Sequence, residues 1–341
     1  MRPSEIGAAV ADRGRAQRAR LQATVIGAGV GGLCAAVTLQ ARGIATTLIE
    51  RTARLGDDCC SWVAGGMLAP YCEGESAPDD VVRFGVGALD WWERHGAQVA
   101  RTGTLVVAPP RDAAEIERFA KRTRMHQGAD EARIATLEPE LARRFRKGLF
   151  FVGEGHLDPR AALAALLQRF EALGGVARFG VSAPPDAERI VDCRGWAARD
   201  ALPELRPVRG EMLVLRAPDV RIARCVRFLH PRIPLYVVPR GQGVYMVGAT
   251  MIESGDSSGI SARSAIELLN AACALHPGFA EAEIVEMRAD LRPAFTDNLP
   301  RVVERDGRIF VNGFYRHGFL LAPAMAERVA AVFPVRVETA A

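Results

Sequence analysis

Three glycines and an acid near the start of the chain have the spacing of a nucleotide-phosphate site. Gly27, Gly29 and Gly32 form the pattern GxGxxG. The first glycine of this pattern permits a tight turn, the second lets a pyrophosphate approach the backbone, and the third lets a helix lie close to a strand. Glu50 follows about twenty residues later, where a carboxylate accepts hydrogen bonds from a ribose 2′-OH. These residues predict a site for FAD or NAD rather than NADP, and a plain crossover with an empty turn is the alternative.

The other reactive residue types give no sign of metal or nucleic-acid chemistry. The seven cysteines include no CxxC pair of the metal-binding type, so we expect reduced thiols in a cytoplasmic protein. Only Lys121 and Lys147 are lysines, and the arginines are scattered through a chain with a net charge of +4, which is typical of a solvated surface. No apolar run reaches the length of a membrane span. We therefore predict no metal, no nucleic-acid partner and no integral membrane segment.

The elements around the glycine turn form a strand, a helix and a second strand. Residues 23–26 are a short apolar run, and residues 30–42 have the pattern of a helix that ends at Gly43. A second apolar run at residues 46–49 delivers Glu50 at its carboxyl end. The helix N-terminus offers free N–H groups and a dipole that favours negative charge, so it is where we expect the phosphates.

The rest of the chain, 341 residues with 49% hydrophobic and 25% charged residues, is long enough for two domains. A long loop rich in Gly, Ser and Cys follows Glu50 and leads to a short helix expected near Gly65. Helical patterns are predicted at residues 79–95, 112–126, 159–173, 262–275 and 318–332. Strands are predicted at residues 103–108, 147–152, 176–179, 190–192, 284–291 and 308–311, and a run of short strands from residue 208 indicates an antiparallel sheet.

These patterns predict an α/β fold in which a Rossmann-like cofactor domain carries an inserted α+β substrate domain with an antiparallel sheet. We assign residues 21–80, 153–206 and 288–336 to the cofactor domain, and residues 81–152 and 207–287 to the substrate domain. Residues 1–20 are rich in arginine and lack the apolar region of a secretory signal. We expect them to form a disordered extension.

Four separated segments carry a family pattern. They are VIGAGVGGLCAAVTLQARG with TLIER, SWVAGGMLAPYCEGE, LYVVPR with GVYMVGATM, and LRPAFTDNLPRV with GFYRHGFLLAPAMA. In these segments the chain resembles the flavin-dependent amine oxidases of the D-amino-acid oxidase superfamily, and within it the glycine oxidases of thiamine biosynthesis. The resemblance extends from Ala23 to about Val332, and the RHGFLLAPA run is its most discriminating part.

The resemblance implies FAD as the cofactor. Val30 and Gly31 would border the pyrophosphate, and the adenosine would meet Glu50, Arg51 and the backbone of Val181. The flavin would be lined by Ser61, Trp62, Gly66, Met67 and Leu68, and wrapped by Phe314, Tyr315, Arg316, His317, Gly318, Phe319 and Leu320. The last helix would then point its N-terminus at the flavin, where its dipole stabilises the charge of the reduced ring. The cysteines of the cofactor loop, Cys59, Cys60 and Cys72, lie on the wrong segment for a cysteinyl link, so we expect non-covalent FAD.

For the substrate, the resemblance implies Tyr236, Met251, Arg292 and Arg316. An amino-acid carboxylate favours a planar bidentate donor, which arginine supplies. The alternatives are a surface ion pair for Arg292, a core aromatic for Tyr236, and packing beside the flavin for Arg316. His317 is interpreted as a capping or packing residue, because the resemblance requires no catalytic side chain.

The reaction implied is hydride transfer from the substrate Cα to flavin N5. The imine would hydrolyse to glyoxylate and ammonia or pass to a thiazole synthase, while O2 becomes hydrogen peroxide. Two alternatives remain open at this point: an oxidase or dehydrogenase for sarcosine, proline or a D-amino acid, and a flavin-binding subunit without a substrate. A homo-oligomer is compatible with the sequence.

Overall fold

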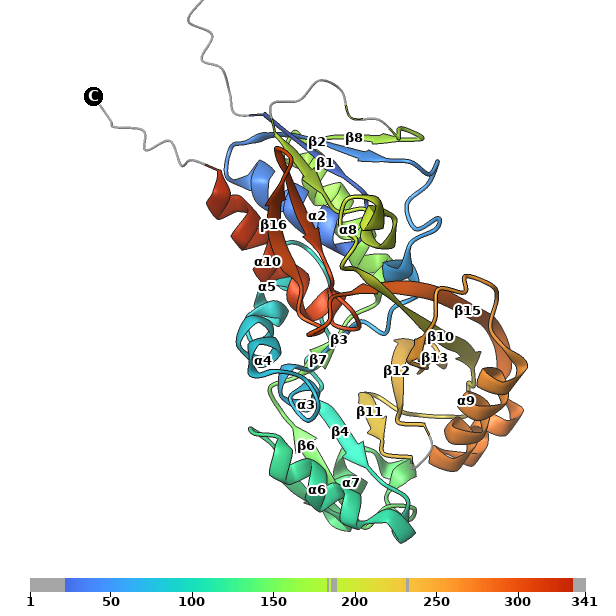
Figure 1. Cartoon of the computed structure of the whole chain (residues 1–341). Helices are drawn as coiled ribbons and strands as arrows, with labels where there is room; N and C mark the ends of the chain where they lie inside the picture. Colours follow the sequence, from blue (N-terminus) through green and yellow to red (C-terminus); the bar gives the residue numbers. More distant parts are fainter. Residues whose placement is uncertain (1–21, 183, 185–188, 231–232, 334–341) are drawn as a thin grey trace, which may run out of the picture.

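The computed structural model describes residues 22–182, 184, 189–230 and 233–333, which form two parts (Figure 1). One part is built on a six-stranded sheet and the other on a nine-stranded sheet. The extension expected at residues 1–20 lies outside the described residues. The α/β fold class with a second, sheet-based part is confirmed.

The six-stranded sheet contains the glycine turn. Its strands lie in the order β16 (Arg301–Arg305), β17 (Arg308–Asn312), β9 (Ile190–Asp192), β1 (Gln22–Ile26), β2 (Ala45–Glu50) and β8 (Val176–Phe179). All neighbours are parallel except β16 and β17. The five expected strands are therefore confirmed, and only the edge strand β16 was not predicted.

Helix α2 (Val30–Ala41) packs between this sheet and two further helices, α8 (Pro159–Ala172) and α10 (Gly318–Val332). It is buried from Val30 to Leu39, because its small and apolar residues are covered on all sides. Figure 1 shows α2 in blue behind the sheet strands, with α10 in red beside it. Segments from the two ends of the described chain thus share one core.

The predicted helix at residues 79–95 is two helices, α4 (Asp79–Gly85) and α5 (Ala88–Arg94). Trp92 of α5 donates a hydrogen bond from Nε1 to the Phe319 carbonyl at 2.8 Å, and the two rings stack at 5.4 Å. These helices therefore pack into the cofactor-side core, and the expected boundary at residues 80/81 does not follow the edge of that core. The exact division into domains stays a prediction.

The nine-stranded sheet forms the second part. The order is β14 (Ile252–Glu253), β10 (Arg206–Arg216), β13 (Val244–Gly248), β12 (Leu235–Gly241), β11 (Cys225–Phe228), β4 (Thr104–Val107), β6 (Lys147–Phe151) and β5 (Gln127–Asp130), with β15 (Glu283–Ala294) also paired to β10. Neighbours are antiparallel as expected, except for the parallel pair β4 and β11. Helix α9 (Ala262–Leu275) covers an apolar cluster of this sheet, and α6 (Ala114–Arg122) and α7 (Glu131–Leu137) lie near β6.

Short elements connect the two parts. The short helix expected near Gly65 is replaced by a 3-10 turn, Cys60–Val63, and by α3 (Pro70–Glu73), because Gly65 and Gly66 interrupt the helical pattern. Between them, β3 (Met67–Leu68) pairs with β7 (Gly155–His156). Further 3-10 turns occur at Pro110–Asp112, Pro139–Leu141, Gly195–Asp200 and Pro277–Glu281. Within the described ranges, no helix has the length and apolar character needed to cross a membrane.

Candidate active site

The glycine turn has the geometry that its sequence predicts. Gly27 has a φ of +98°, which favours glycine, and its N–H donates to the Ile49 carbonyl at 2.8 Å. A Cβ on Gly32 would overlap the Gly27 carbonyl oxygen, so only glycine lets α2 lie this close to the turn. A Cβ on Gly31 would lie 2.7 Å from the Phe314 ring. The turn, α2 and the segment before α10 therefore fit together closely.

Glu50 and Ser61 lie at the N-terminal end of α2. Glu50 Oε2 accepts a hydrogen bond from the Ala28 N–H at 2.8 Å, and Ser61 Oγ accepts one from the Val30 N–H at 3.1 Å. The Val181 N–H donates to the Glu50 carbonyl at 2.9 Å, which places this residue beside the same strand end. Arg51 is exposed and pairs with Asp58 at 3.3 Å. The residues expected to contact the adenosine thus lie together.

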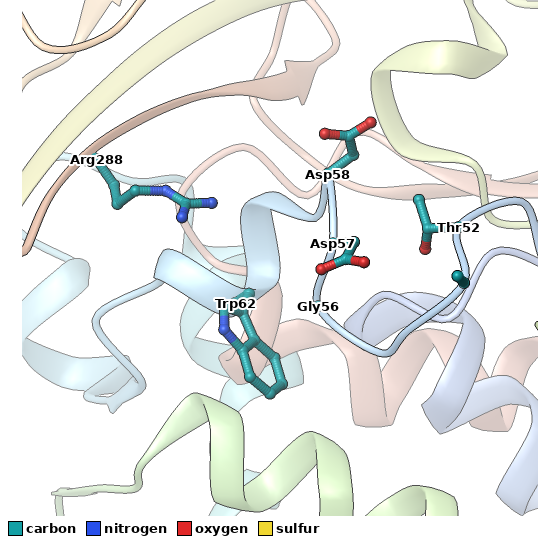
Figure 2. Close-up of a pocket in the computed structure, with 7 residues that line it drawn as sticks. Thr52, Gly56, Asp57, Asp58, Trp62 and Arg288 are labelled. Carbon is teal, nitrogen blue, oxygen red and sulfur yellow. The ribbon is translucent and has the colours of Figure 1, made fainter.

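A cavity of about 500 Å³ lies beside the loop that follows Glu50 (Figure 2). Figure 2 shows Asp57 and Asp58 on the loop and Arg288 on the strand across from it. The lining residues are Thr52, Ala53, Gly56, Asp57, Asp58, Trp62 and Arg288. Because two carboxylates face one guanidinium, this cavity is a poor match for a pyrophosphate. The N-terminus of α2 is the better position for the phosphates.

The flavin-lining segment expected at residues 61–68 is held in place by Arg240. Its Nη2 donates to the carbonyls of Ala64 at 3.2 Å and Gly65 at 2.7 Å. Burial lowers the pKa of Arg240 to about 10, so it stays charged at neutral pH. Of the expected lining residues, Ser61, Gly66 and Leu68 are buried, while Trp62 and Met67 are partly exposed.

The start of α10 lies against the start of α2. A Cβ on Gly318 would lie 3.2 Å from Val30 Cγ1, so the N-termini of the two helices meet. Phe319 and Leu320 are buried in the core, which leaves their backbone as the part that can face a cofactor. His317 occupies the N-cap position of α10, but its side chain makes no capping hydrogen bond.

Two of the expected substrate residues, Arg292 and Arg316, contact the loop at residues 250–251, and Tyr236 packs on Gly65. Arg292 donates from Nη1 to the Thr250 carbonyl at 3.0 Å, and Arg316 Nη1 lies 3.4 Å from the Met251 sulfur. The two guanidinium groups therefore meet consecutive residues of one loop. Tyr236 packs against Gly65, where a Cβ would lie 2.9 Å from the ring. Burial raises the pKa of Tyr236, so its phenol is neutral, and the charges of Arg292 and Arg316 act on it.

The expected substrate residues differ in how far they are exposed to solvent. Met251 is 47% exposed and lies at the rim, where the Tyr315 hydroxyl also contacts its sulfur at 3.3 Å. Arg292 and Arg316 are half-buried. In the described part of the chain Arg292 forms no ion pair. The structure therefore does not support the alternative that Arg292 belongs to a surface ion pair.

Two charged residues of the site were not predicted, Glu73 and Arg227. Glu73 Oε2 lies 2.8 Å from Arg316 Nη2, and Glu73 Oε1 lies 3.5 Å from Arg227 Nη1. Both are buried. A sequence signal for Arg227 exists, because it is a charge within the apolar strand run CVRFL. Glu73 lies in the SWVAGGMLAPYCEGE segment, but its partners are far away in the sequence.

The residues present fit a dinucleotide with a flavin ring. The glycine turn leaves the backbone open at Gly29, where a Cβ would have only ordinary contacts with Cys59 and Ser61 at 3.5 Å. The N-termini of α2 and α10 meet beside this turn and supply positive potential there. No group of three or more potential metal ligands occurs among the described residues. All seven cysteines are free thiols.

The fold and this site define a flavoenzyme, and the chain belongs to the family of FAD dependent oxidoreductases (DAO), which matches residues 22–332. A Rhizobium etli protein named as a thiamine biosynthesis oxidoreductase, ThiO, is 53% identical over 309 residues, which cover 90% of this chain and 94% of the relative. The glycine oxidase of Bacillus licheniformis is 26% identical, covering 94% of this chain and 96% of that enzyme.

Two further comparisons concern fold and chain organisation. The crystal structure of glycine oxidase from Geobacillus kaustophilus matches with a TM-score of 0.76 and 24% identity, covering 91% of this chain and 94% of that one. This match shows the fold. The bifunctional protein ThiO/ThiG of Nostoc sp. strain PCC 7120 is 26% identical, and the match covers 90% of this chain but 51% of the bifunctional protein.

Proposed function

We propose that the protein oxidises the amine of glycine, or of a similarly small amino acid, to the imine, with O2 reduced to hydrogen peroxide. The observation that supports this proposal is that Arg292 and Arg316 contact consecutive residues, Thr250 and Met251, while Tyr236 packs on Gly65 and its phenol lies within the field of both arginines. The 53% identity to a protein named ThiO supports the same conclusion.

Each residue has a separate task in this proposal. Arg292 binds the substrate carboxylate with its planar fork, and the neutral Tyr236 phenol donates a further hydrogen bond. The bound flavin supplies the oxidising chemistry by accepting a hydride from the substrate Cα. The chain contributes orientation, since a fixed carboxylate leaves the Cα in one position. No side chain is required as a general base.

We place FAD along the path from Glu50 to the start of α10. Glu50, Arg51 and Val181 would hold the adenosine, and the N-terminus of α2 would hold the phosphates. The flavin would lie against Gly66 and the backbone of residues 314–320. Burial raises the pKa of the thiols of Cys59 and Cys60, which keeps them protonated and poorly nucleophilic, so the flavin is expected to be non-covalent.

A thiazole synthase is the proposed consumer of the imine. The support is the name ThiO/ThiG of the Nostoc protein, which joins a ThiO part to a second part in one chain. The match covers about half of that protein, 51% of its length.

Anaerobic reduction of the flavin tests the proposal. Purified protein is mixed without O2 with glycine, sarcosine, D-alanine or D-proline, and the loss of flavin absorbance is followed. We expect glycine to be among the fastest, and O2 consumption with peroxide formation on exposure to air. Preference for sarcosine or D-proline would reassign the substrate. Failure of every amine to bleach the flavin would favour a binding subunit without its own substrate.

A further inference from the structure

Glu73 is a buried acid between the arginines of the substrate pocket. It ends α3, is 8% exposed, and lies 2.8 Å from Arg316 and 3.5 Å from Arg227. Arg316 also donates to Ser76 Oγ at 2.9 Å. The carboxylate of Glu73 thus contacts two guanidinium groups from different elements, β11 and the segment before α10.

The charges of this cluster are fixed near neutral pH. Burial alone would raise the pKa of Glu73, but Arg316, His317 and Arg227 together lower it to about 2, so the acid is ionised. His317 Nδ1 lies 3.5 Å from the same carboxylate, yet burial lowers the pKa of His317 to about 4, so the imidazole is neutral. One negative charge is therefore shared between two arginines.

Arg292 differs from these two arginines because it forms no ion pair within the described chain. Burial raises the pKa of Asp290, two residues earlier on β15, and the charges of Arg288 and Arg292 oppose this shift. The charge of Arg292, like those of Glu73 and Arg316, acts on the Tyr236 phenol. Arg227 and Arg316 each retain one buried Nε–H without a hydrogen-bond partner among the described residues. The pocket thus offers one guanidinium without an ion pair and two that share the single negative charge of Glu73.

We propose that Glu73 restricts the pocket to substrates with a single carboxylate. By pairing with Arg316 and Arg227, it leaves Arg292 as the arginine available to the substrate, and its own charge repels a second carboxylate. Amino dicarboxylates are therefore excluded, although the pocket contains three arginines. This inference rests on the proposed amino-acid oxidation, and it adds a specificity residue that does not take part in the chemistry.

Two unreactive ligands of matched size test this inference. Malonate carries two carboxylates, and malonamate, its monoamide, carries one. Their dissociation constants are measured by titration calorimetry on FAD-loaded protein. Like charges placed together at a binding site cost several kcal/mol, and about 1.4 kcal/mol is tenfold. We expect wild-type protein to bind malonamate at least tenfold more tightly than malonate.

Glu73→Gln should remove or reverse this preference, because Arg316 and Arg227 become available to the second carboxylate. Glu73→Asp should keep much of the wild-type ratio, since the charge remains. Glu138→Gln is the matched control: Glu138 is also buried and pairs with an arginine, Arg224, at 2.9 Å, outside this cluster. It should lower the melting temperature without changing the malonamate-to-malonate ratio.

Two results would overturn the inference. One is wild-type protein that binds malonate as well as malonamate, which decides the matter even if Glu73→Gln does not accumulate. The other is a folded Glu73→Gln protein with the wild-type ratio. Failure of the proposed function would look different from failure of this inference. If no amino acid reduced the flavin, the malonamate-to-malonate ratios of wild type and Glu73→Gln could still be measured and would be unchanged.

Discussion

Replacement of Arg292 probes the proposed substrate site most directly. Its guanidinium is half-buried, donates to the Thr250 carbonyl at 3.0 Å, and forms no ion pair among the described residues. A substrate carboxylate would complete the pair. Removal of one partner of a buried charged pair costs about 2–5 kcal/mol, much of it from leaving the other charge unpaired. At about 1.4 kcal/mol per tenfold, Arg292→Ala should lower kcat/KM for glycine by roughly thirty-fold to several thousand-fold.

Two further variants refine this prediction. Arg292→Lys should recover only part of the loss, because an ammonium group replaces the bidentate fork. Gly210→Ala leaves Arg292 in the sequence but adds a Cβ that would overlap its guanidinium, so the side chain has to move. We expect Gly210→Ala to raise KM for glycine in the same direction as Arg292→Ala, but by less.

The assay compares two substrates in each variant. Steady-state O2 consumption gives kcat/KM for glycine and for an amine without a carboxylate, and the flavin spectrum reports on the cofactor site. The carboxylate-free amine should lose far less, and the spectrum should change little. If Arg292→Ala slows both substrates equally, Arg292 is a structural residue. The carboxylate would then have to be sought at Arg316.

Three other predictions address the cofactor and stability. Glu50→Ala should weaken FAD binding by about tenfold to a hundredfold without altering substrate preference, because a charged hydrogen bond is lost. An unchanged FAD dissociation constant would show that Glu50 only holds its own hydrogen bonds with Ala28 and Thr52. Acid or heat should release FAD from the precipitated protein, whereas flavin that stays with the pellet would show a covalent link. Glu154 is fully buried, which raises its pKa from 4.5 to about 8. The contribution of the protonated acid to the free energy of unfolding is therefore complete below pH 4.5 and is lost as the pH rises toward 8. Glu154→Gln should therefore gain stability over wild type across this range, by up to about 5 kcal/mol in chemical unfolding, and a difference independent of pH would contradict this assignment.

Local sequence signals predicted the elements that have clear ends. Helix α9 has the predicted bounds 262–275 because Ser261 caps it, and α10 begins at the predicted Gly318. Helix α7 was missed although Asp130 caps it, since its seven residues are too few for a periodic pattern. Strand β16 was missed because its burial depends on pairing with β17, which local residues do not reveal.

Local sequence signals predicted less of the functional site than of the fold. The glycine turn and Glu50 could be placed from spacing alone, because each residue acts within one local unit. The substrate residues came from the family resemblance, and the structure brings Arg292 and Arg316 to adjacent residues of one loop. Glu73 could not be predicted in this way. Its partner Arg316 lies more than two hundred positions away, and periodicity indicates which side of an element is buried but not what it meets.

The contact between α2 and α10 has a consequence for the biosynthesis of the protein. During translation, α2 emerges early, but α10, which packs against it, is the last described element to leave the ribosome. Until then the nascent chain exposes an apolar helix, and such surfaces promote aggregation and engage chaperones. The proposed cofactor site includes residues 314–320, so it is complete only when they are in place. A cofactor bound at the proposed site would therefore be captured after translation of nearly the whole described chain, as a late stabiliser rather than as a nucleus for folding.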